Sequence, residues 1–175
     1  MKNRQAFIFI PSEKRGFLAG LTGFFVLIFM CLLNGNLSAA NLRDVVINEI
    51  AWMGTAASTY DEWIELYNNT GSTVNLTNWT LTAADGTPSI TLSGSVAPYG
   101  YFLLERTDNN TVSDIAADQI YSGSTENGDE DFQLKDSSDT LIDQVDCSSG
   151  WFAGDNTNKI TMERINPEID GSTST

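Results

Sequence analysis

The segment DEWIELYN, residues 61–68, brings the carboxylates of Asp61, Glu62 and Glu65 close together in the sequence. Two carboxylates about 5–9.5 Å apart, one of them with a raised pKa, are the groups that hydrolyse glycosides. Polar and apolar residues alternate along this segment, which is typical of a β-strand and places Glu62 and Glu65 on opposite faces. Side chains on opposite faces cannot flank one substrate, so the segment does not predict a glycosidase.

A second arrangement of carboxylates depends on how the strands pair. Glu49 could meet Glu65 on a neighbouring strand, although directly opposed like charges cost stability unless something binds between them. We interpret these acids as residues of exposed strand ends and edges, where charge prevents association between sheet edges. The chain has no histidine, which removes Ser-His and Cys-His catalysis and the commonest zinc ligand. We therefore predict that the chain is not an enzyme and has no catalytic, cofactor-binding or metal-binding residue.

Two acidic loops contain the residue types that calcium prefers, since calcium takes about six to eight oxygen ligands. Neither loop has the spacing of an EF-hand, and ordinary acidic turns explain both. We predict no cofactor, with calcium as the one alternative. The residues concerned are Asp108, Asn109, Asn110 and Asp114 in the first loop, and Glu126, Asn127, Asp129, Glu130 and Asp131 in the second.

Aromatic side chains offer another kind of site, because an exposed ring can stack on a sugar. Trp63 and Tyr67 share one face of the 61–68 segment, whereas Trp79 alternates with apolar neighbours and is expected in the core. The pair Trp151-Phe152 lies in a glycine-flanked loop and is the better surface candidate. Core packing or loop anchoring is the preferred interpretation of these aromatic residues, and a carbohydrate-binding face is the alternative.

The first 40 residues have the features of an export signal. Basic residues precede GFLAGLTGFFVLIFMCLL, an apolar run without charge, and small residues follow it up to Ala40. This order is typical of a secretory signal peptide cleaved after Ala40. The alternative is an uncleaved membrane anchor of about 17–20 residues with its basic flank in the cytoplasm. In both cases residues 41 onward are expected outside the cytoplasm, either secreted or at the cell surface.

Without this leader the chain is strongly acidic. Of 9 basic and 23 acidic residues, residues 1–40 contain four and one, which leaves 5 against 22 and a net charge of −17. Such a surface repels phosphate, so we predict no nucleic-acid partner. A membrane partner is expected only if the leader stays attached.

One cysteine and several sequons need a separate interpretation. Cleavage would leave Cys147 as the one cysteine, which cannot form an internal disulfide or a structural zinc site. It either pairs with a cysteine outside these residues or stays buried. Sequons begin at Asn68, Asn75, Asn78 and Asn109, and they matter only in a host that glycosylates proteins.

Short runs of alternating polarity, separated by turn-forming residues, occupy the rest of the chain. We expect about eight or nine strands and no long amphipathic helix, a pattern typical of an all-β antiparallel sandwich. A change of alternation at Thr77-Asn78 predicts a bulge or a strand that crosses between sheets. The domain is expected over residues 41–167, with a linker or open end over 168–175. The expected strands lie within residues 44–53, 61–68, 74–81, 90–92, 101–107, 132–134, 141–147 and 159–165.

Several pieces of sequence, in one order, carry a resemblance to a known family. They are VVINEIAW, DEWIELYN, VNLTNWTL, FQLKD with LIDQV, and TMER, spread over residues 44–166. In order and spacing they resemble the bacterial lamin-tail domain, an immunoglobulin-like β-sandwich also found at the end of nuclear lamins. The resemblance implies a non-catalytic sandwich that is often attached to exported enzymes or surface proteins. The chain has no heptad rod, basic nuclear-localisation run or prenylation box, so a nuclear filament role is rejected.

Two functions follow as hypotheses. The first is a non-catalytic, secreted or surface-displayed module for adhesion, scaffolding or domain attachment, with an extracellular protein or polysaccharide as partner. The second is an accessory module of a larger exported hydrolase, which would bind carbohydrate or calcium. Both require a two-layer packing that buries Ile64, Leu66, Trp79 and Leu81 and leaves the acids in water.

Overall fold

The computed structural model describes residues 39–172 of the chain. Nearly all of the expected leader and the last three residues of the expected linker lie outside this range. Within the range, no helix has the length and apolar character needed to span a membrane. Residues 39–172 contain no helix and eleven strands: β1 (Val45–Ile50), β2 (Trp63–Asn68), β3 (Val74–Asn75), β4 (Thr80–Ala83), β5 (Ser89–Thr91), β6 (Ser95–Val96), β7 (Tyr101–Arg106), β8 (Gln119–Tyr121), β9 (Glu130–Lys135), β10 (Leu141–Cys147) and β11 (Met162–Glu163).

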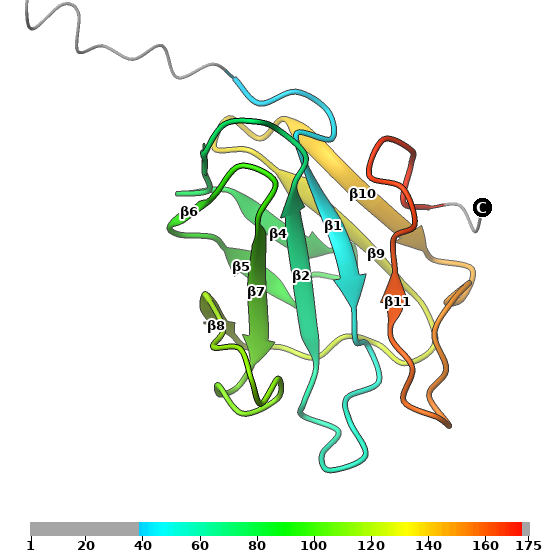
Figure 1. Ribbon diagram of the computed structural model, residues 1–175. Coiled ribbons are helices and arrows are strands. Elements are labelled where there is room, and N and C mark those ends of the chain that lie inside the picture. The colour runs from blue at the N-terminus through cyan, green and yellow to red at the C-terminus, as the bar shows by residue number, and fades with distance from the viewer. Residues whose placement is uncertain (1–38, 173–175) are drawn as a thin grey trace, which may run out of the picture. The chain divides into compact units, whose positions relative to one another are not determined.

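Two sheets pack face to face and form the body of the domain (Figure 1). The strand order is β11-β1-β2-β7-β8 in the first sheet and β10-β9-β4-β5 in the second, and a separate short ladder joins β3 to β6. All of these pairs are antiparallel except β7 with β8, which is parallel. The chain is therefore the all-β, immunoglobulin-like sandwich that the sequence predicts, with one parallel pair at a sheet edge.

The core between the sheets follows from period-two alternation. Along β2, half-buried and buried side chains alternate, and both Ile64 and Leu66 are completely buried. In the second sheet Leu81 of β4 lies beside Leu134 of β9, and both are also completely buried. Trp79 joins the same cluster. The prediction that these apolar side chains pack between two layers is confirmed, and each such burial contributes about 1.5–3 kcal/mol.

Residues 74–83 move from the small ladder to the second sheet, as the change of alternation at Thr77-Asn78 predicts. β3 pairs with β6, and β4 then pairs with β5 and β9. Between them Asn78 has a φ of 65°, a conformation that asparagine adopts more readily than most residues. The strand count exceeds the expected eight or nine because the strand expected over 74–81 divides into β3 and β4, and because the short strands β6 and β8 lie outside the expected ranges.

Asn68, the last residue of β2, joins three segments at one end of the sandwich. Its buried side chain donates through Nδ2 to the carbonyl oxygens of Ser72 and Ala97, both at 2.8 Å. Its Oδ1 accepts a hydrogen bond from the N–H of Thr70 at 3.0 Å. A buried carbonyl without a donor is costly, so Asn68 fixes both the turn after β2 and the corner before β7.

We expect Asn68→Ala to lower the free energy of unfolding by about 3 kcal/mol, because at least two backbone acceptors lose their donor. Urea unfolding followed by circular dichroism measures the change. Asn69→Ala is the matched control, since the Asn69 side chain bonds to Glu168 at the surface, and its cost should stay near about 0.5 kcal/mol. Similar losses in the two variants would contradict the role given to Asn68.

Candidate functional site

Three carboxylates stand side by side on the outer face of the first sheet. Glu49 of β1 pairs directly with Glu65 of β2 on one side and with Glu163 of β11 on the other. The sequence raises the pairing of Glu49 with Glu65, and the structure contains it. Glu163 was not anticipated, because β11 lies far along the chain and is only two residues long. We call Glu49, Glu65 and Glu163 the carboxylate row.

Neighbouring donors already hold two members of the carboxylate row. Thr161 Oγ1 donates to Glu49 Oε1 at 2.5 Å and Trp63 Nε1 donates to Glu49 Oε2 at 3.3 Å. Asn48, at the bulge in β1, donates through Nδ2 to Glu65 Oε1 at 2.9 Å. Burial and repulsion from the other two carboxylates raise the pKa of Glu65, and the Asn48 hydrogen bond opposes them. Side by side on a sheet face, these groups do not place an acid and a base on opposite sides of a substrate.

Glu62 lies on the interior side of the same sheet and is only 4% exposed. Its Oε1 accepts from Arg106 Nη1 at 2.7 Å, and its Oε2 accepts from the N–H of Thr125 at 2.9 Å. Burial raises the pKa of Glu62, and these two partners oppose the rise. The expectation of an exposed strand-end acid is therefore wrong for Glu62, which stays buried because an arginine and a backbone donor compensate it. Glu62 and Glu65 lie on opposite faces of the sheet, as the alternation of residues 61–68 predicts.

The first acidic loop serves the fold. Glu105 is completely buried on β7 and accepts hydrogen bonds from the N–H groups of Thr111 and Val112, at 3.2 and 3.0 Å. Within the loop, Asn109 Oδ1 accepts from the N–H of Ala117 at 2.6 Å. Both interactions use side-chain oxygens to satisfy backbone donors, so they shape the loop around β7.

The second acidic loop likewise uses its oxygens within the protein. Glu130 is buried, and its Oε1 accepts from the N–H of Asp131 at 3.1 Å. Asp131 in turn accepts from the side-chain amide of Gln144 at 2.8 Å. Across residues 39–172 no three or more acidic or cysteine side chains are grouped so that they could hold a metal ion. The acidic side chains of the two loops are therefore not gathered into a group of three.

Three of the five aromatic candidates serve packing. Trp79 is buried in the core, as predicted. The Trp151 ring stacks on Trp52, with ring centroids 5.2 Å apart and 6° between the planes, and its Nε1 donates to the carbonyl oxygen of Glu126 at 3.0 Å. Trp151 thus anchors a loop, as the preferred interpretation predicts, and Trp52 covers one face of its ring. Phe152 is half-buried and packs against the core.

The two remaining aromatic candidates lie on the outer face of β2. Trp63 donates to the carboxylate row, and Tyr67 lies beside Tyr101 of β7, with ring centroids 5.1 Å apart and 43° between the planes. Tyr101 is 58% exposed, so it is the most accessible ring of this face. The sequence did not single it out, although its pairing with Tyr67 follows from the antiparallel register of β2 and β7.

Cys147 and the first sequon are both inside the protein. Cys147 is a free thiol on β10 that is 1% exposed, and burial raises its pKa to about 11. Of the two fates that the sequence leaves open, the structure shows the buried one. Asn68, the acceptor of the first sequon, is also buried, whereas Asn75, Asn78 and Asn109 are exposed.

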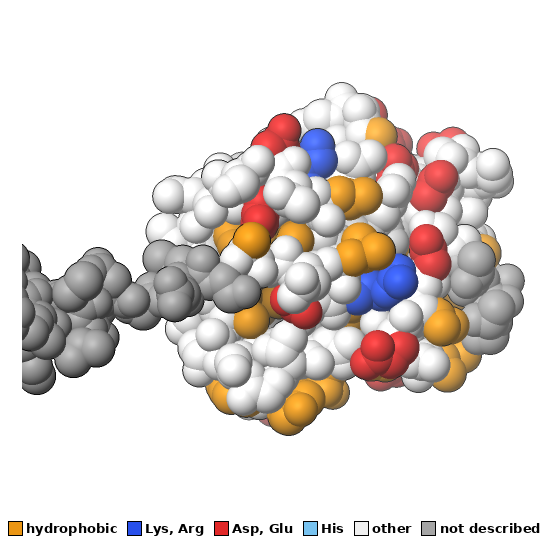
Figure 2. Space-filling view, turned by 90° about the horizontal axis from the view of Figure 1, so that it is seen from above, with side chains coloured by type: hydrophobic (Ala, Val, Ile, Leu, Met, Phe, Trp, Pro, Cys, Tyr) orange, Lys and Arg blue, Asp and Glu red, His pale blue; other side chains and the backbone are white. Residues whose placement is uncertain are grey.

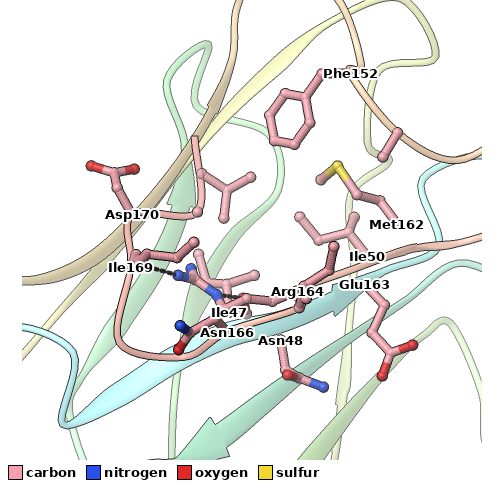
Figure 3. A pocket seen from close by; sticks show the side chains of 14 residues that line it. Ile47, Asn48, Ile50, Phe152, Met162, Glu163, Arg164, Asn166, Ile169 and Asp170 are labelled. Carbon is pink, nitrogen blue, oxygen red and sulfur yellow. Dashed lines mark hydrogen bonds between the residues drawn. The ribbon is translucent and has the colours of Figure 1, made fainter. Parts of the chain in front are cut away.

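A pocket of about 190 Å³, which we call the β11 pocket, opens where β1, β10 and β11 meet (Figure 3). β1 and β11 are neighbours in the first sheet, and β10 is the edge strand of the second. Apolar side chains form its inner wall, and Phe152 points into it from the opposite side (Figure 3). The inner wall consists of Ile47, Ile50, Val145 and Met162, and Phe152 faces it.

Residues 164–171, which we call the closing segment, line one side of the β11 pocket. Arg164 holds this segment through Nη2 to Asp143 Oδ2 at 2.5 Å, Nε to the Ile47 carbonyl at 3.0 Å, and Nη1 to the Ile169 carbonyl at 2.6 Å. The side chains of Arg164 and Asp143 are only 5% and 2% exposed. Burial raises the pKa of Asp143 to about 6, although Arg164 opposes the rise.

The β11 pocket has no local sequence signature, because its lining comes from β1, β10, the loop after β10 and the C-terminal segment. Residues 168–172 belong to the part expected as a linker, yet they contact the domain. Ser172 Oγ accepts from the N–H of Asp146 at 2.9 Å, and Glu168 accepts from Asn69 at 3.0 Å. The one available signal was the apolar character of Ile169, which is unusual in a linker.

The two-sheet body, its buried ion pairs and its hydrogen-bonded surface carboxylates define an immunoglobulin-like β-sandwich module. Residues 38–149 match the family model of the Lamin Tail Domain, and the chain belongs to this family. The match includes β1 to β10 and ends before the closing segment of the β11 pocket. No curated protein sequence matches the chain.

Glu65→Gln is expected to raise the free energy of unfolding at pH 7 by about 0.5 kcal/mol, because it removes one of three neighbouring like charges. An acid whose pKa is raised by folding binds its proton more tightly in the folded state. Glu65 therefore favours folding at low pH, and this contribution is lost as the pH rises above 4.5, its unfolded value. Urea unfolding between pH 4 and 8 should show a flatter curve for the variant, whereas Asp114→Asn, at an exposed position outside the row, should leave the curve unchanged. Parallel curves for wild type and Glu65→Gln would contradict the repulsion.

Arg164→Met is expected to lower the free energy of unfolding by about 3 kcal/mol at pH 7.5, because Asp143 would stay buried and charged with the hydrogen bond from the Ile47 N–H but without its cationic partner. At pH 5 the loss should be smaller, since Asp143, with a pKa of about 6, is then mostly neutral. Lys135→Met is the control. The Lys135 Nζ atom lies 3.6 Å from Asp139 Oδ1, and the Asp139 side chain is 86% exposed, so this surface pair should contribute less than about 1 kcal/mol. A loss that does not change with pH would exclude the charge of Asp143 as the cause.

Proposed function

We propose that this chain is a non-catalytic module, secreted or displayed at the cell surface, that attaches a partner protein or a neighbouring domain. The state of the carboxylates supports this proposal most directly. Glu62 is paired with Arg106 in the interior, and Glu49 and Glu65 are held by donors on a sheet face. A glycosidase would need a carboxylate on each side of one bound substrate, and these acids are arranged differently.

The charge of the domain supports a partner with basic groups. The residues after the leader have a net charge of −17, and on the face seen in Figure 2 acidic side chains are spread among hydrophobic ones while basic groups are few. Such a field raises the encounter rate with cationic partners and weakens as salt is added. Export is proposed from residues 1–40, since their basic, apolar and small-residue regions follow the order of a secretory signal.

Expression of the full chain with a C-terminal tag in a bacterial host tests export and attachment together. We expect the protein in the envelope or the medium, with an N-terminus at Asn41 by mass spectrometry if the leader is cleaved, or at Met1 if it is an anchor. The purified protein should sediment with isolated envelopes at about 50 mM salt and dissociate at about 500 mM. The proposal would be contradicted if the protein stayed in the cytoplasm or did not bind envelopes. It would also be contradicted if the bound partner were chemically altered, because the module is proposed to be non-catalytic.

A second candidate is an accessory module that binds polysaccharide, and the exposed Tyr101 beside Tyr67 favours it. Exposed aromatic rings carry much of the contact area in binding surfaces. Sedimentation with chitin, cellulose and peptidoglycan tests this candidate. Tyr101→Ser should abolish the binding and Ile115→Ser, another exposed apolar residue, should not. Binding that survives Tyr101→Ser would remove this surface from consideration.

A further inference from the structure

We propose that the β11 pocket receives one large apolar side chain of a partner polypeptide, and that basic residues flanking this side chain contact the carboxylate row. This inference rests on the proposed attachment function and identifies the surface and the chemistry that would perform it. It concerns a part of the chain that lies partly beyond the family match, because the closing segment begins after residue 149.

The size and walls of the β11 pocket suit a single side chain. Its volume of about 190 Å³ is comparable to the roughly 150 Å³ apolar cavity that is known to take up benzene in another protein. The inner wall presents Ile47, Ile50 and Met162, while Phe152 points in from the other side (Figure 3). A phenylalanine, leucine or methionine side chain fits this space, whereas a folded element would not.

The polar groups of the pocket disfavour a negatively charged occupant. Arg164 is the cation of the pocket lining, and its Nε, Nη1 and Nη2 atoms are already bonded to Ile47, Ile169 and Asp143. Three of its five N–H groups are therefore engaged, and the carboxylates of Asp143 and Asp170 offset its positive charge, so the head group of a fatty acid or a phosphate finds little attraction there. A neutral apolar group meets no such obstacle, because it requires no hydrogen bond.

The carboxylate row begins at the edge of the same pocket. Met162 is buried toward the pocket, and the next residue, Glu163, directs its carboxylate away from it (Figure 3). β11 is the edge strand of the first sheet, so a polypeptide with one side chain in the pocket can pass around β11 and reach the row. Opposed carboxylates repel one another, and a lysine or arginine placed over Glu163 and Glu49 relieves that repulsion.

Exposed apolar area next to the pocket supports a protein partner. Ile165 lines the pocket and is 85% exposed, and Ile169, also in the lining, is 37% exposed. Isolated apolar residues on a surface need no explanation, but apolar residues that surround an apolar pocket and border a charged surface are typical of interaction sites. The combination favours an apolar anchor with cationic neighbours over a purely electrostatic contact.

Fluorescence anisotropy with the purified protein and fluorescein-labelled heptapeptides tests the inference. The probes are Lys-Lys-Gly-Phe-Gly-Lys-Lys, the same peptide with alanine in place of phenylalanine, and one with glutamate in place of every lysine. Burial of the phenyl ring predicts roughly 30-fold tighter binding of the first peptide than of the alanine peptide. The glutamate peptide should not bind, because the row and the overall charge repel it.

Variants of the protein locate the binding site. Ala153→Trp fills the pocket from an exposed lining position, and it should reduce the preference for phenylalanine at least about tenfold. Ile165→Ser should weaken binding. Ile115→Ser, which removes another isoleucine that is 60% exposed, should not. Glu163→Gln should weaken binding of both lysine peptides. Thermal melting verifies that each variant is folded.

Equal binding of the phenylalanine and alanine peptides, or an unchanged preference in both Ala153→Trp and Ile165→Ser, would overturn the inference. Failure of the peptides to bind while envelope binding persists would reject the β11 pocket and leave the proposed attachment function in place. Failure of both measurements would reject the two together.

Discussion

The structure depends on the burial of one apolar face from each of two sheets, and on the partners that this burial demands for the acids trapped beside it. Ile64 and Leu66 from one layer and Leu81 from the other can be dry only if nearby acids such as Glu62 and Asp143 are compensated. Two of the few cations, Arg106 and Arg164, form ion pairs with these interior acids. The outer surface is consequently even more acidic than the composition suggests. It presents an excess of negative charge beside exposed apolar side chains.

The sequence predicts the fold well wherever alternation is long enough to see. The six residues of β2 alternate without interruption, and their buried side is the side that the sequence predicts. The crossing at Asn78 is also visible in the sequence. Apolar residues change there from one set of alternate positions to the other, and such a change requires the backbone to change course. The two-residue strand β6 and the parallel pairing of β7 with β8 leave no such trace, since they depend on where distant segments dock.

The surface chemistry was less predictable for a physical reason. Whether Glu62 is exposed depends on Arg106, which lies on another strand, and whether Trp151 faces water depends on Trp52, about a hundred residues earlier. A single sequence shows which residues could carry charge or stack, but not which partner neutralises or covers them. The β11 pocket is the extreme case, because four separated segments form it and the last of them has the composition of a linker.

Both ends of the described chain are fastened to β10. The N–H of Arg43 bonds to the Ile142 carbonyl, Arg164 bonds to Asp143, and Ser172 bonds to the N–H of Asp146. Traction applied between the two ends of the domain would therefore be taken up along one edge strand before it could pull the sheets apart. A domain built in this way transmits mechanical load through a short path of hydrogen bonds and one ion pair, and its hydrophobic interior stays outside that path.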